Sequence, residues 1–295
     1  MITTKKKTML ADLLCLVVAC IWGTGFVASQ MAIDANMSAA LIMVLRFSIA
    51  AVVMLLVCLP RIKGLTKQEL KRGMVAGLFL FGGFYTQILG QSRTTISHCA
   101  FLTATNVVMV PFLVWIMNKR RPAGKIFVIT GMTLLGIGVL SIKPGSFELS
   151  FNVGDALSLL CALLFALHIS SLEWATKEAD VMRINFVQLA TAAVISAVVF
   201  VATDLDAAAA ADLKMGLPAV LFLGLFSTCL CYFLQTLAQK YTTPAQAGVL
   251  LSTEGLFGSL FSVILGMEVL TTNMVIGGLI ILLSVILLEW SPSKK

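Results

Sequence analysis

Glu254 and Asn106 are the side chains with the clearest chemical potential, because each lies near the middle of a long apolar stretch. An ionisable group in the hydrocarbon core of a membrane is costly, which makes Glu254 a candidate to hold a substrate ammonium group or a coupling proton. The alternative is a protonated glutamic acid that hydrogen-bonds to a neighbouring helix. Asn106 can donate and accept hydrogen bonds, so it is a second candidate contact for a polar ligand.

The two residues occupy equivalent positions of an internal repeat. A shift of 148 residues places 84–113 on 232–261 and makes seven of these thirty positions identical. The identities include two glutamines and three threonines, which chance would not favour in apolar sequence: Gln87 with Gln235, Leu89 with Leu237, Gln91 with Gln239, Thr94 with Thr242, Thr95 with Thr243, Leu102 with Leu250, and Thr105 with Thr253. The next pair is Asn106 with Glu254, so the copies differ there by one ionisable group.

Polar and aromatic side chains recur at helical spacing beside these positions. One stripe runs down each copy: Thr228, Tyr232, Gln235 and Gln239 in the second, and Leu80, Phe84, Gln87 and Gln91 in the first. Lipid cannot satisfy glutamine amides, so both stripes are expected to face the bundle interior, where they contact substrate or bond to other helices. Trp22 can stack on a ligand. His168 titrates near neutral pH and suits the inner route, although a neutral packing histidine fits equally well.

The predicted substrate-binding residues are therefore Glu254, Asn106, Gln87, Gln235, Tyr232, Trp22 and His168. Arg46 also lies within an apolar stretch, and it must pair with a carboxylate, with backbone carbonyls or with a substrate anion; we favour a structural pairing. All seven cysteines fall in apolar segments and are interpreted as packing residues. Since no metal-ligand spacing appears, we expect neither a metal site nor a cofactor.

The bulk composition indicates which elements must position these residues. Of 295 residues, 59% are hydrophobic and only 12% are charged, which is typical of an integral membrane protein whose partner is the lipid bilayer. The net charge of +7 does not indicate nucleic-acid binding, because the basic residues are dispersed over many short loops. Ten apolar stretches are long enough to cross a bilayer as helices: about 10–30, 38–59, 73–91, 97–117, 125–142, 153–173, 184–202, 217–238, 245–266 and 272–289.

The distribution of Lys and Arg predicts the orientation. Seventeen of the 21 fall in the alternate segments that include both termini, and only Arg93, Lys143 and Lys214 fall in the other loops. We therefore expect a multi-pass protein of the cytoplasmic (inner) membrane with both termini in the cytoplasm. Because each half, 1–145 and 146–295, holds five spans, the second must cross the membrane inverted relative to the first. Inverted repeats around a central cavity are typical of secondary transporters.

Several short motifs resemble the ten-helix EamA-like branch of the drug/metabolite transporter superfamily: Ile21-Trp22-Gly23-Thr24-Gly25-Phe26, Leu45-Arg46-Phe47, Phe165-Ala166-Leu167-His168-Ile169, Glu254-Gly255 and Leu265-Gly266-Met267-Glu268. The resemblance covers the whole chain and implies a five-plus-five inverted helical bundle that exports small metabolites, often amino acids. Gly255 stands where the family commonly has proline. This difference predicts that the ninth span lacks the kink that the family would place there.

The sequence thus favours an alternating-access exporter of a small metabolite such as an amino acid. In this hypothesis Glu254 holds an ammonium group or a coupling proton, amides bond the substrate and aromatic rings stack on it. An organic-cation or drug transporter of the same fold is the alternative, with Glu254 as the counter-charge. An intramembrane enzyme would have to use His98, His168 or Glu173, which form no clustered motif, so no catalytic residue is predicted. The substrate, the coupling ion, the direction of transport and the oligomeric state do not follow from the sequence.

Overall fold

The computed structural model describes residues 4–94, 96–119, 121–141, 152–205, 207–264 and 269–290, and its regular elements in these ranges are all helical. The motif at 265–268 and the side chain of His98 lie outside this description. Helices of the first half are α1 (Thr4–Gly23), α2 (Gly25–Asp34), α3 (Ala39–Ile62), α4 (Lys67–Gln91), α5 (Ile96–Ala104), α6 (Asn106–Asn118) and α7 (Gly124–Ser141).

The second half repeats much of this order. Its elements are α8 (Val153–Thr176), α9 (Val181–Thr203), a short 3-10 turn η1 (Ala207–Ala210), α10 (Leu213–Phe222), a π-helical segment η2 (Leu223–Leu230), α11 (Cys231–Gln239), α12 (Pro244–Leu251), α13 (Glu254–Ile264) and α14 (Thr272–Trp290). Helices α10, η2 and α11 follow one another without a break, so the polar stripe of the sequence lies on one long helix with a π-helical centre.

Side-chain caps fix where several of these helices begin. Thr66 and Glu69 form a capping box at the start of α4, and Asn152 and Asp155 form the same arrangement at the start of α8. Each box provides hydrogen-bond acceptors for two backbone N–H groups that would otherwise have no partner at the start of the helix. At α12 the side chain of Thr243 accepts from the backbone N–H of Gln246, and a proline follows at the first helical position.

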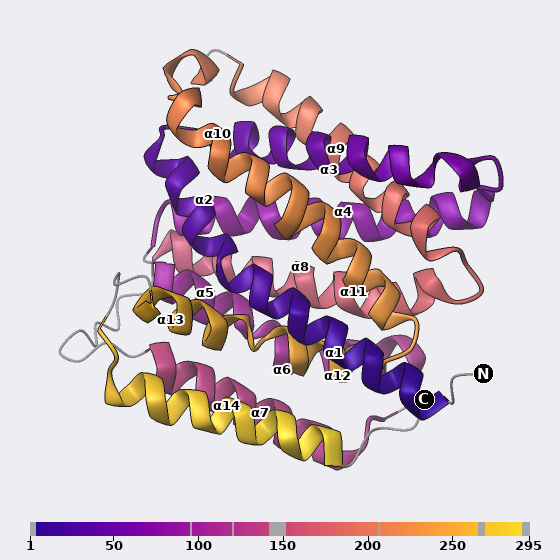
Figure 1. Cartoon of the computed structure of the whole chain (residues 1–295), viewed down its shortest axis with the longest axis vertical. Helices are drawn as coiled ribbons and strands as arrows, with labels where there is room; N and C mark the ends of the chain where they lie inside the picture. Colours follow the sequence, from indigo (N-terminus) through magenta and orange to yellow (C-terminus); the bar gives the residue numbers. More distant parts are fainter. Residues whose placement is uncertain are drawn as a thin grey trace.

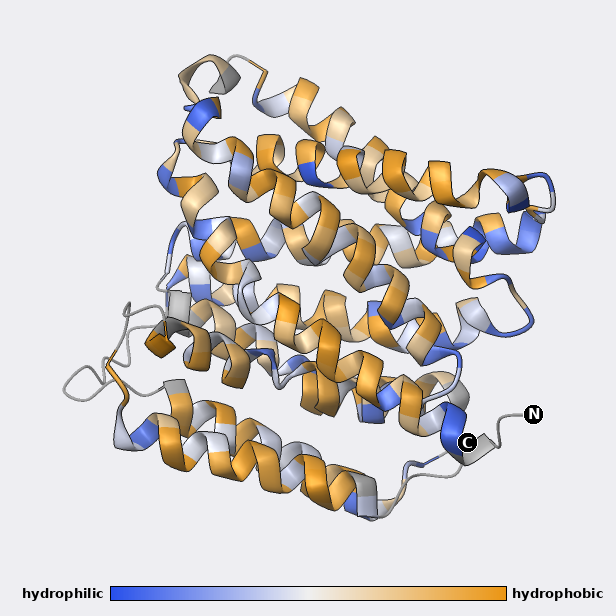
Figure 2. Cartoon of the chain, viewed as in Figure 1, coloured by the Kyte–Doolittle hydropathy of each residue, from blue (hydrophilic) through white to orange (hydrophobic). Residues whose placement is uncertain are grey.

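Seven helical stretches of the described residues are long and apolar enough to cross a membrane: 6–34, 39–62, 67–91, 99–117, 153–176, 181–203 and 213–239. Two shorter apolar helices cover 124–140 and 272–288. Figure 2 shows apolar residues along the middle of these helices and hydrophilic residues gathered at both ends of the bundle. The chain is therefore a multi-pass membrane protein, and the exact number of ten spans stays a prediction.

Helices from the two halves pack against one another throughout the bundle. α3 lies along α9, α4 packs on α8 and α9, and α7 pairs with α14 at one edge (Figure 1). The start of α1 and the end of α14 lie at the same end of the bundle in this view. Glycines permit the closest approaches: a Cβ on Gly77 would lie 2.6 Å from the carbonyl oxygen of Gln188, and one on Gly23 would lie 2.7 Å from the backbone nitrogen of Gly258.

Three of the apolar stretches are interrupted near their centres. Thr24 separates α1 from α2, Thr105 separates α5 from α6, and Ser252 with Thr253 separates α12 from α13. The prediction of an unkinked ninth span is therefore wrong. The threonine hydroxyl of Thr253 donates to the carbonyl of Leu250 at 2.6 Å, and this bond stabilises the break without a proline.

Candidate functional site

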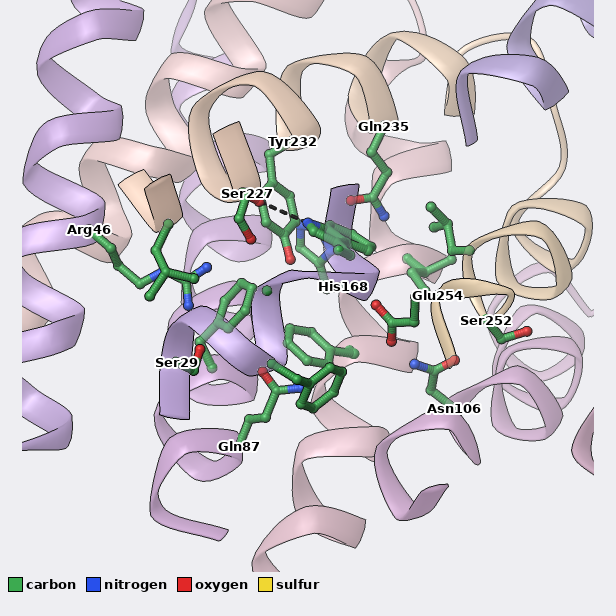
Figure 3. Close-up of a pocket in the computed structure, with 18 residues that line it drawn as sticks. Ser29, Arg46, Gln87, Asn106, His168, Ser227, Tyr232, Gln235, Ser252 and Glu254 are labelled. Atoms are coloured by element: carbon green, nitrogen blue, oxygen red, sulfur yellow. Dashed lines mark hydrogen bonds between the residues drawn. The ribbon is translucent and has the colours of Figure 1, made fainter. Parts of the chain in front are cut away.

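A cavity lies where the three helix breaks meet the π-helical segment. It encloses about 620 Å³, part of it open to solvent. The seven predicted substrate-binding residues all line it: Glu254, Asn106, Gln87, Gln235, Tyr232, Trp22 and His168 (Figure 3). They come from six helices, since Tyr232 and Gln235 both lie on α11. Whether they bind a substrate stays a prediction.

Glu254 and Asn106 are each the first residue of a half-helix. Thr105 precedes Asn106 at the start of α6, and Thr253 precedes Glu254 at the start of α13. In Figure 3 the carboxylate of Glu254 and the amide of Asn106 point toward one another. Among the described residues, neither the carboxylate of Glu254 nor the side-chain amide of Asn106 has a hydrogen-bond partner. The neighbouring hydroxyls of Ser252, Thr253 and Thr105 bond to backbone carbonyls instead. The two groups are therefore available to a ligand at the N-terminal ends of interrupted helices, which carry partial positive charge.

Aromatic rings form the wall between the polar groups. The ring of Tyr232 lies 5.2 Å from that of Trp22, 5.8 Å from that of Phe84 and 5.5 Å from that of His168. Phe165 packs edge-on against Phe84 at 5.0 Å. Edge-to-face contacts of this kind stabilise ring orientation. Tyr232 is only 1% exposed, so it is held by this cluster rather than free to rotate.

The π-helical segment supplies backbone and hydroxyl groups to the cavity. Trp22 donates its indole N–H to the carbonyl oxygen of Ser227 at 2.8 Å. That carbonyl lies within η2, where the wider winding changes the regular hydrogen-bond partners. π-Helical turns of this type occur frequently at functional sites. The segment therefore fixes the position of Trp22 at the cavity wall.

The two predicted glutamines differ in their surroundings. Gln235 is buried and donates to the side chain of Gln239 at 3.0 Å, which in turn donates to the carbonyl of Ile169. The amide oxygen of Gln235 is buried and has no hydrogen-bond partner in the described part of the chain. A buried acceptor of this kind needs a partner, which a ligand N–H or a water can supply. Gln87 lines the opposite wall and is less buried.

His168 is anchored in a polar network behind the cavity. Its Nε2 lies 2.9 Å from the amide oxygen of Gln188, whose nitrogen donates to Asn185 and to the hydroxyl of Thr236. The ring is only 1% exposed and packs edge-on against Tyr232. His168 therefore lines the cavity and packs against Tyr232, and its role on the inner route stays a prediction.

Arg46, for which the sequence favoured a structural pairing, also lines the cavity. Its Nε and Nη2 donate to the hydroxyl of Thr228 at 3.0 and 2.9 Å, and its guanidinium lies 3.9 Å from the ring centroid of Phe84. We expected a structural pairing, and the hydroxyl and ring provide part of one. Its place in the cavity wall, however, could have been inferred only from its position some eight residues into an apolar span.

Hydrogen bonds close both ends of the bundle. Thr94 donates to Asp155 at 2.7 Å in the first turn of α8, and its repeat equivalent Thr242 donates to Asp12 of α1 at 2.6 Å. In Figure 1 the connection from α4 to α5 and the connection from α11 to α12 lie at opposite ends of the bundle. Each bond joins the connection between two helices of one half to a helix of the other half.

An ion-pair cluster joins α3, α4 and α9 at one of these ends. Arg183 donates to both carboxylate oxygens of Glu69, at 2.9 and 2.8 Å, and Arg61 bonds to Asp180 at 2.9 Å. Burial acts to raise the pKa of Asp180, but the hydrogen bonds from Arg61 and from two backbone N–H groups outweigh it and lower that pKa. No group of metal-binding side chains occurs among the described residues.

Comparisons with known proteins place this geometry in a family. The model of the EamA-like transporter family matches residues 9–142 and 152–290. An uncharacterized transporter of Archaeoglobus fulgidus is 32% identical over 289 residues, a match that covers 96% of this chain and 87% of that protein. A crystal structure covering 94% of this chain and 97% of its own has the same fold, with a TM-score of 0.77 at 17% identity.

Proposed function

Since the chain belongs to the EamA-like transporter family and is a membrane transporter, we propose that it is an alternating-access exporter of small metabolites such as amino acids. The observation that carries this proposal is the cavity, which brings a carboxylate, three side-chain amides and aromatic rings together at the helix breaks. Glu254 holds the substrate ammonium group or a coupling proton. Asn106, Gln87 and Gln235 bond the substrate, and Tyr232 and Trp22 stack on it.

We further propose that 1–145 and 146–295 are inverted five-helix repeats, which together give ten spans in the cytoplasmic membrane with both termini inside. The packing supports this arrangement, because exchanging the halves converts one contact into another. The contact of α4 with α8 becomes that of α11 with α1, and the contacts of α3 with α9 and of α7 with α14 are converted into themselves. The family model also matches twice, once in each half.

Alternating access is supported by the hydrogen bonds at the two ends of the bundle. Thr94 with Asp155 and Thr242 with Asp12 are equivalent under the repeat and lie at opposite ends. A transporter that opens one end at a time must break one such contact and keep the other. The two bonds therefore supply one candidate gate contact at each end of the bundle.

Exchange in liposomes tests the proposal. The purified protein is reconstituted in liposomes loaded with unlabelled amino acids, and uptake of each labelled amino acid is measured over a range of pH. We expect exchange of at least one amino acid by the wild type and a loss of about 10- to 100-fold in Glu254→Gln, as for removal of a charged hydrogen-bond partner. Glu178→Gln makes the same change in an exposed connection and serves as the control. Wild-type exchange by Glu254→Gln at every pH would contradict the role of the carboxylate.

An organic-cation transporter is the second candidate, because a carboxylate beside aromatic rings also suits a quaternary amine. A competition panel of amino acids and quaternary amines in the same liposomes separates the two functions. Amines that compete better than every amino acid would favour the second candidate.

A further inference from the structure

Arg46 is a buried cation for which the described residues supply no opposite charge. Its side chain is 1% exposed, and no carboxylate of the described chain is within ion-pair distance of it. A guanidinium has five N–H donors. Within the described ranges only two hydrogen bonds use them, and both end on the single hydroxyl of Thr228. A buried charge that is left uncompensated is strongly destabilising, so the site favours the entry of an anion.

The surroundings hold the guanidinium in one orientation. Thr228 fixes one edge from η2, and the ring of Phe84 covers one face at 3.9 Å. A Cβ on Gly224 would lie 3.2 Å from the backbone oxygen of Arg46, so this glycine permits α3 to lie directly against the π-helical segment. Figure 3 shows the guanidinium directed toward the cavity. A cation held in this way is preorganised for a planar, two-oxygen acceptor such as a carboxylate.

Glu254 provides the opposite charge on the far side of the same cavity. In Figure 3, Tyr232 lies between Arg46 and Glu254, and the two charged groups do not pair with each other. Neither charge is repeated in the other half of the chain. Counted from the N-caps of α3 and α9, Ser38 and Asp180, the repeat equivalent of Arg46 is Gln188, and that of Glu254 is Asn106; both are uncharged. The duplicated bundle thus contains a cavity with one positive and one negative wall.

We propose that Arg46 binds the carboxylate of the substrate and that the substrate is a zwitterion, with its carboxylate at Arg46 and its ammonium group at Glu254. This rests on the proposed transport function and names its substrate class. A substrate with both groups neutralises both walls, whereas an amine leaves Arg46 uncompensated and a carboxylic acid leaves Glu254 uncompensated. The cavity accordingly selects zwitterions over organic cations.

Binding to the purified full-length protein tests the assignment without requiring transport. Three ligand classes with the same carbon skeletons are compared: α- and ω-amino acids, the amines that lack the carboxylate, and the carboxylic acids that lack the ammonium group. Their affinities are measured by titration calorimetry at pH 7. We expect the zwitterions to bind the wild type most tightly, and Arg46→Gln to weaken zwitterions and acids about 10- to 100-fold while leaving amines unchanged.

Two further variants keep the result interpretable. Arg93→Gln removes an arginine from an exposed connection and should not change any class. Thr228→Val retains the charge of Arg46 but removes the hydroxyl that orients it, and it should weaken zwitterions and acids about five-fold. If Arg46→Gln does not fold, as judged by gel filtration and thermal unfolding, Thr228→Val and Arg46→Lys decide the question.

Each outcome separates this inference from the proposed function. Selective loss of the carboxylate-bearing ligands in the Arg46 and Thr228 variants supports the assignment. Equal loss of all three classes, or wild-type binding of amines alone, overturns it, and the organic-cation transporter then remains. Absence of binding in every class also overturns it. Zwitterion binding without exchange in liposomes would instead contradict the transport function and leave the carboxylate site intact.

Discussion

At Thr105 and at Thr253 the chain interrupts a helix twice in the same way. Each threonine hydroxyl donates to the carbonyl three residues earlier at 2.6 Å, and each threonine carbonyl accepts from the backbone N–H four residues later. The next residue begins a half-helix in both copies, but it is Asn106 in one and Glu254 in the other. The repeat thus conserves the backbone that presents a polar group and changes the charge of that group. The backbone geometry of the break is therefore the same in both halves, whereas the charge of the side chain that it presents differs.

Making the two breaks alike should have the largest effect. Glu254→Asn gives both half-helices the same first residue. We expect exchange in liposomes to fall about 10- to 100-fold, because Glu254 is the one carboxylate among the described residues that line the cavity. Adding Asn106→Glu moves the carboxylate to the other break. It should not restore exchange, since the side chains around the two breaks differ: Tyr232 of the second half is replaced by Phe84, which has no hydroxyl, in the first.

Restored exchange in the double variant would show that the two breaks are interchangeable. That result would contradict the functional asymmetry and would leave only the position of the charge within the cavity as the requirement.

Truncating the amide alone should have a smaller effect. Asn106→Ala removes one neutral hydrogen-bonding group from the cavity, and a single such bond contributes about 1 kcal/mol, or about five-fold. We expect the apparent affinity for the exchanged amino acid to fall by that factor, measured from the concentration dependence of exchange. Thr105 still forms the break, so thermal unfolding should change little. A loss as large as that of Glu254→Asn would place Asn106 on equal terms with the carboxylate.

The two end bonds allow a comparison of the gates. Thr242→Val removes the hydrogen bond that the structure gives to Asp12, whereas after Thr94→Val the carboxylate of Asp155 still caps α8. Thr242→Val should therefore raise hydrogen exchange of the amides around 10–14 and 238–246 more than Thr94→Val raises exchange around 90–94 and 152–156. Equal effects at the two ends would show that the cap of α8 does not hold that gate.

The smallest effects should distinguish two glycines of α13. A Cβ on Gly255 would meet nothing within 4 Å, whereas a Cβ on Gly258 would lie 3.1 Å from the backbone oxygen of Gly23. Gly255→Ala should raise the midpoint of thermal unfolding slightly, because alanine is favoured over glycine in a helix by up to about 1 kcal/mol. Gly258→Ala should lower it. A fall with Gly255→Ala would indicate that the break before α13 needs a glycine there.

Much of the site could be predicted because few polar side chains are tolerated within the membrane unless they have a hydrogen-bonding partner. Glu254, Asn106, Gln87 and Gln235 stood out since each needs a partner that lipid cannot supply, and all of them line the cavity. The break of the ninth span could not be predicted from the loss of proline. A threonine hydroxyl that bonds to its own backbone produces the same interruption, and threonines are too common in apolar helices to be diagnostic.

Packing faces were also beyond the sequence. Gly258 of α13 lies against Gly23 of α1, a contact that residue types and spacing do not indicate. The break at Thr253 rotates α13 relative to α12 and changes which residues meet a neighbour. The sequence likewise could not identify the partner of Arg46, because its hydrogen-bond acceptor Thr228 lies 182 residues away on a π-helical segment.

The sequence by itself determined that this is a helical membrane protein, that it is duplicated, and that its two copies differ in charge at one equivalent position. Those features depend on composition, on apolar segment length and on residue identity, which are local properties. The tertiary structure alone decided that three helix breaks meet at one cavity and that Arg46 faces Glu254 across Tyr232. The physical reason is that backbone interruptions and close glycine contacts depend on neighbouring helices, and they set where each side chain is directed.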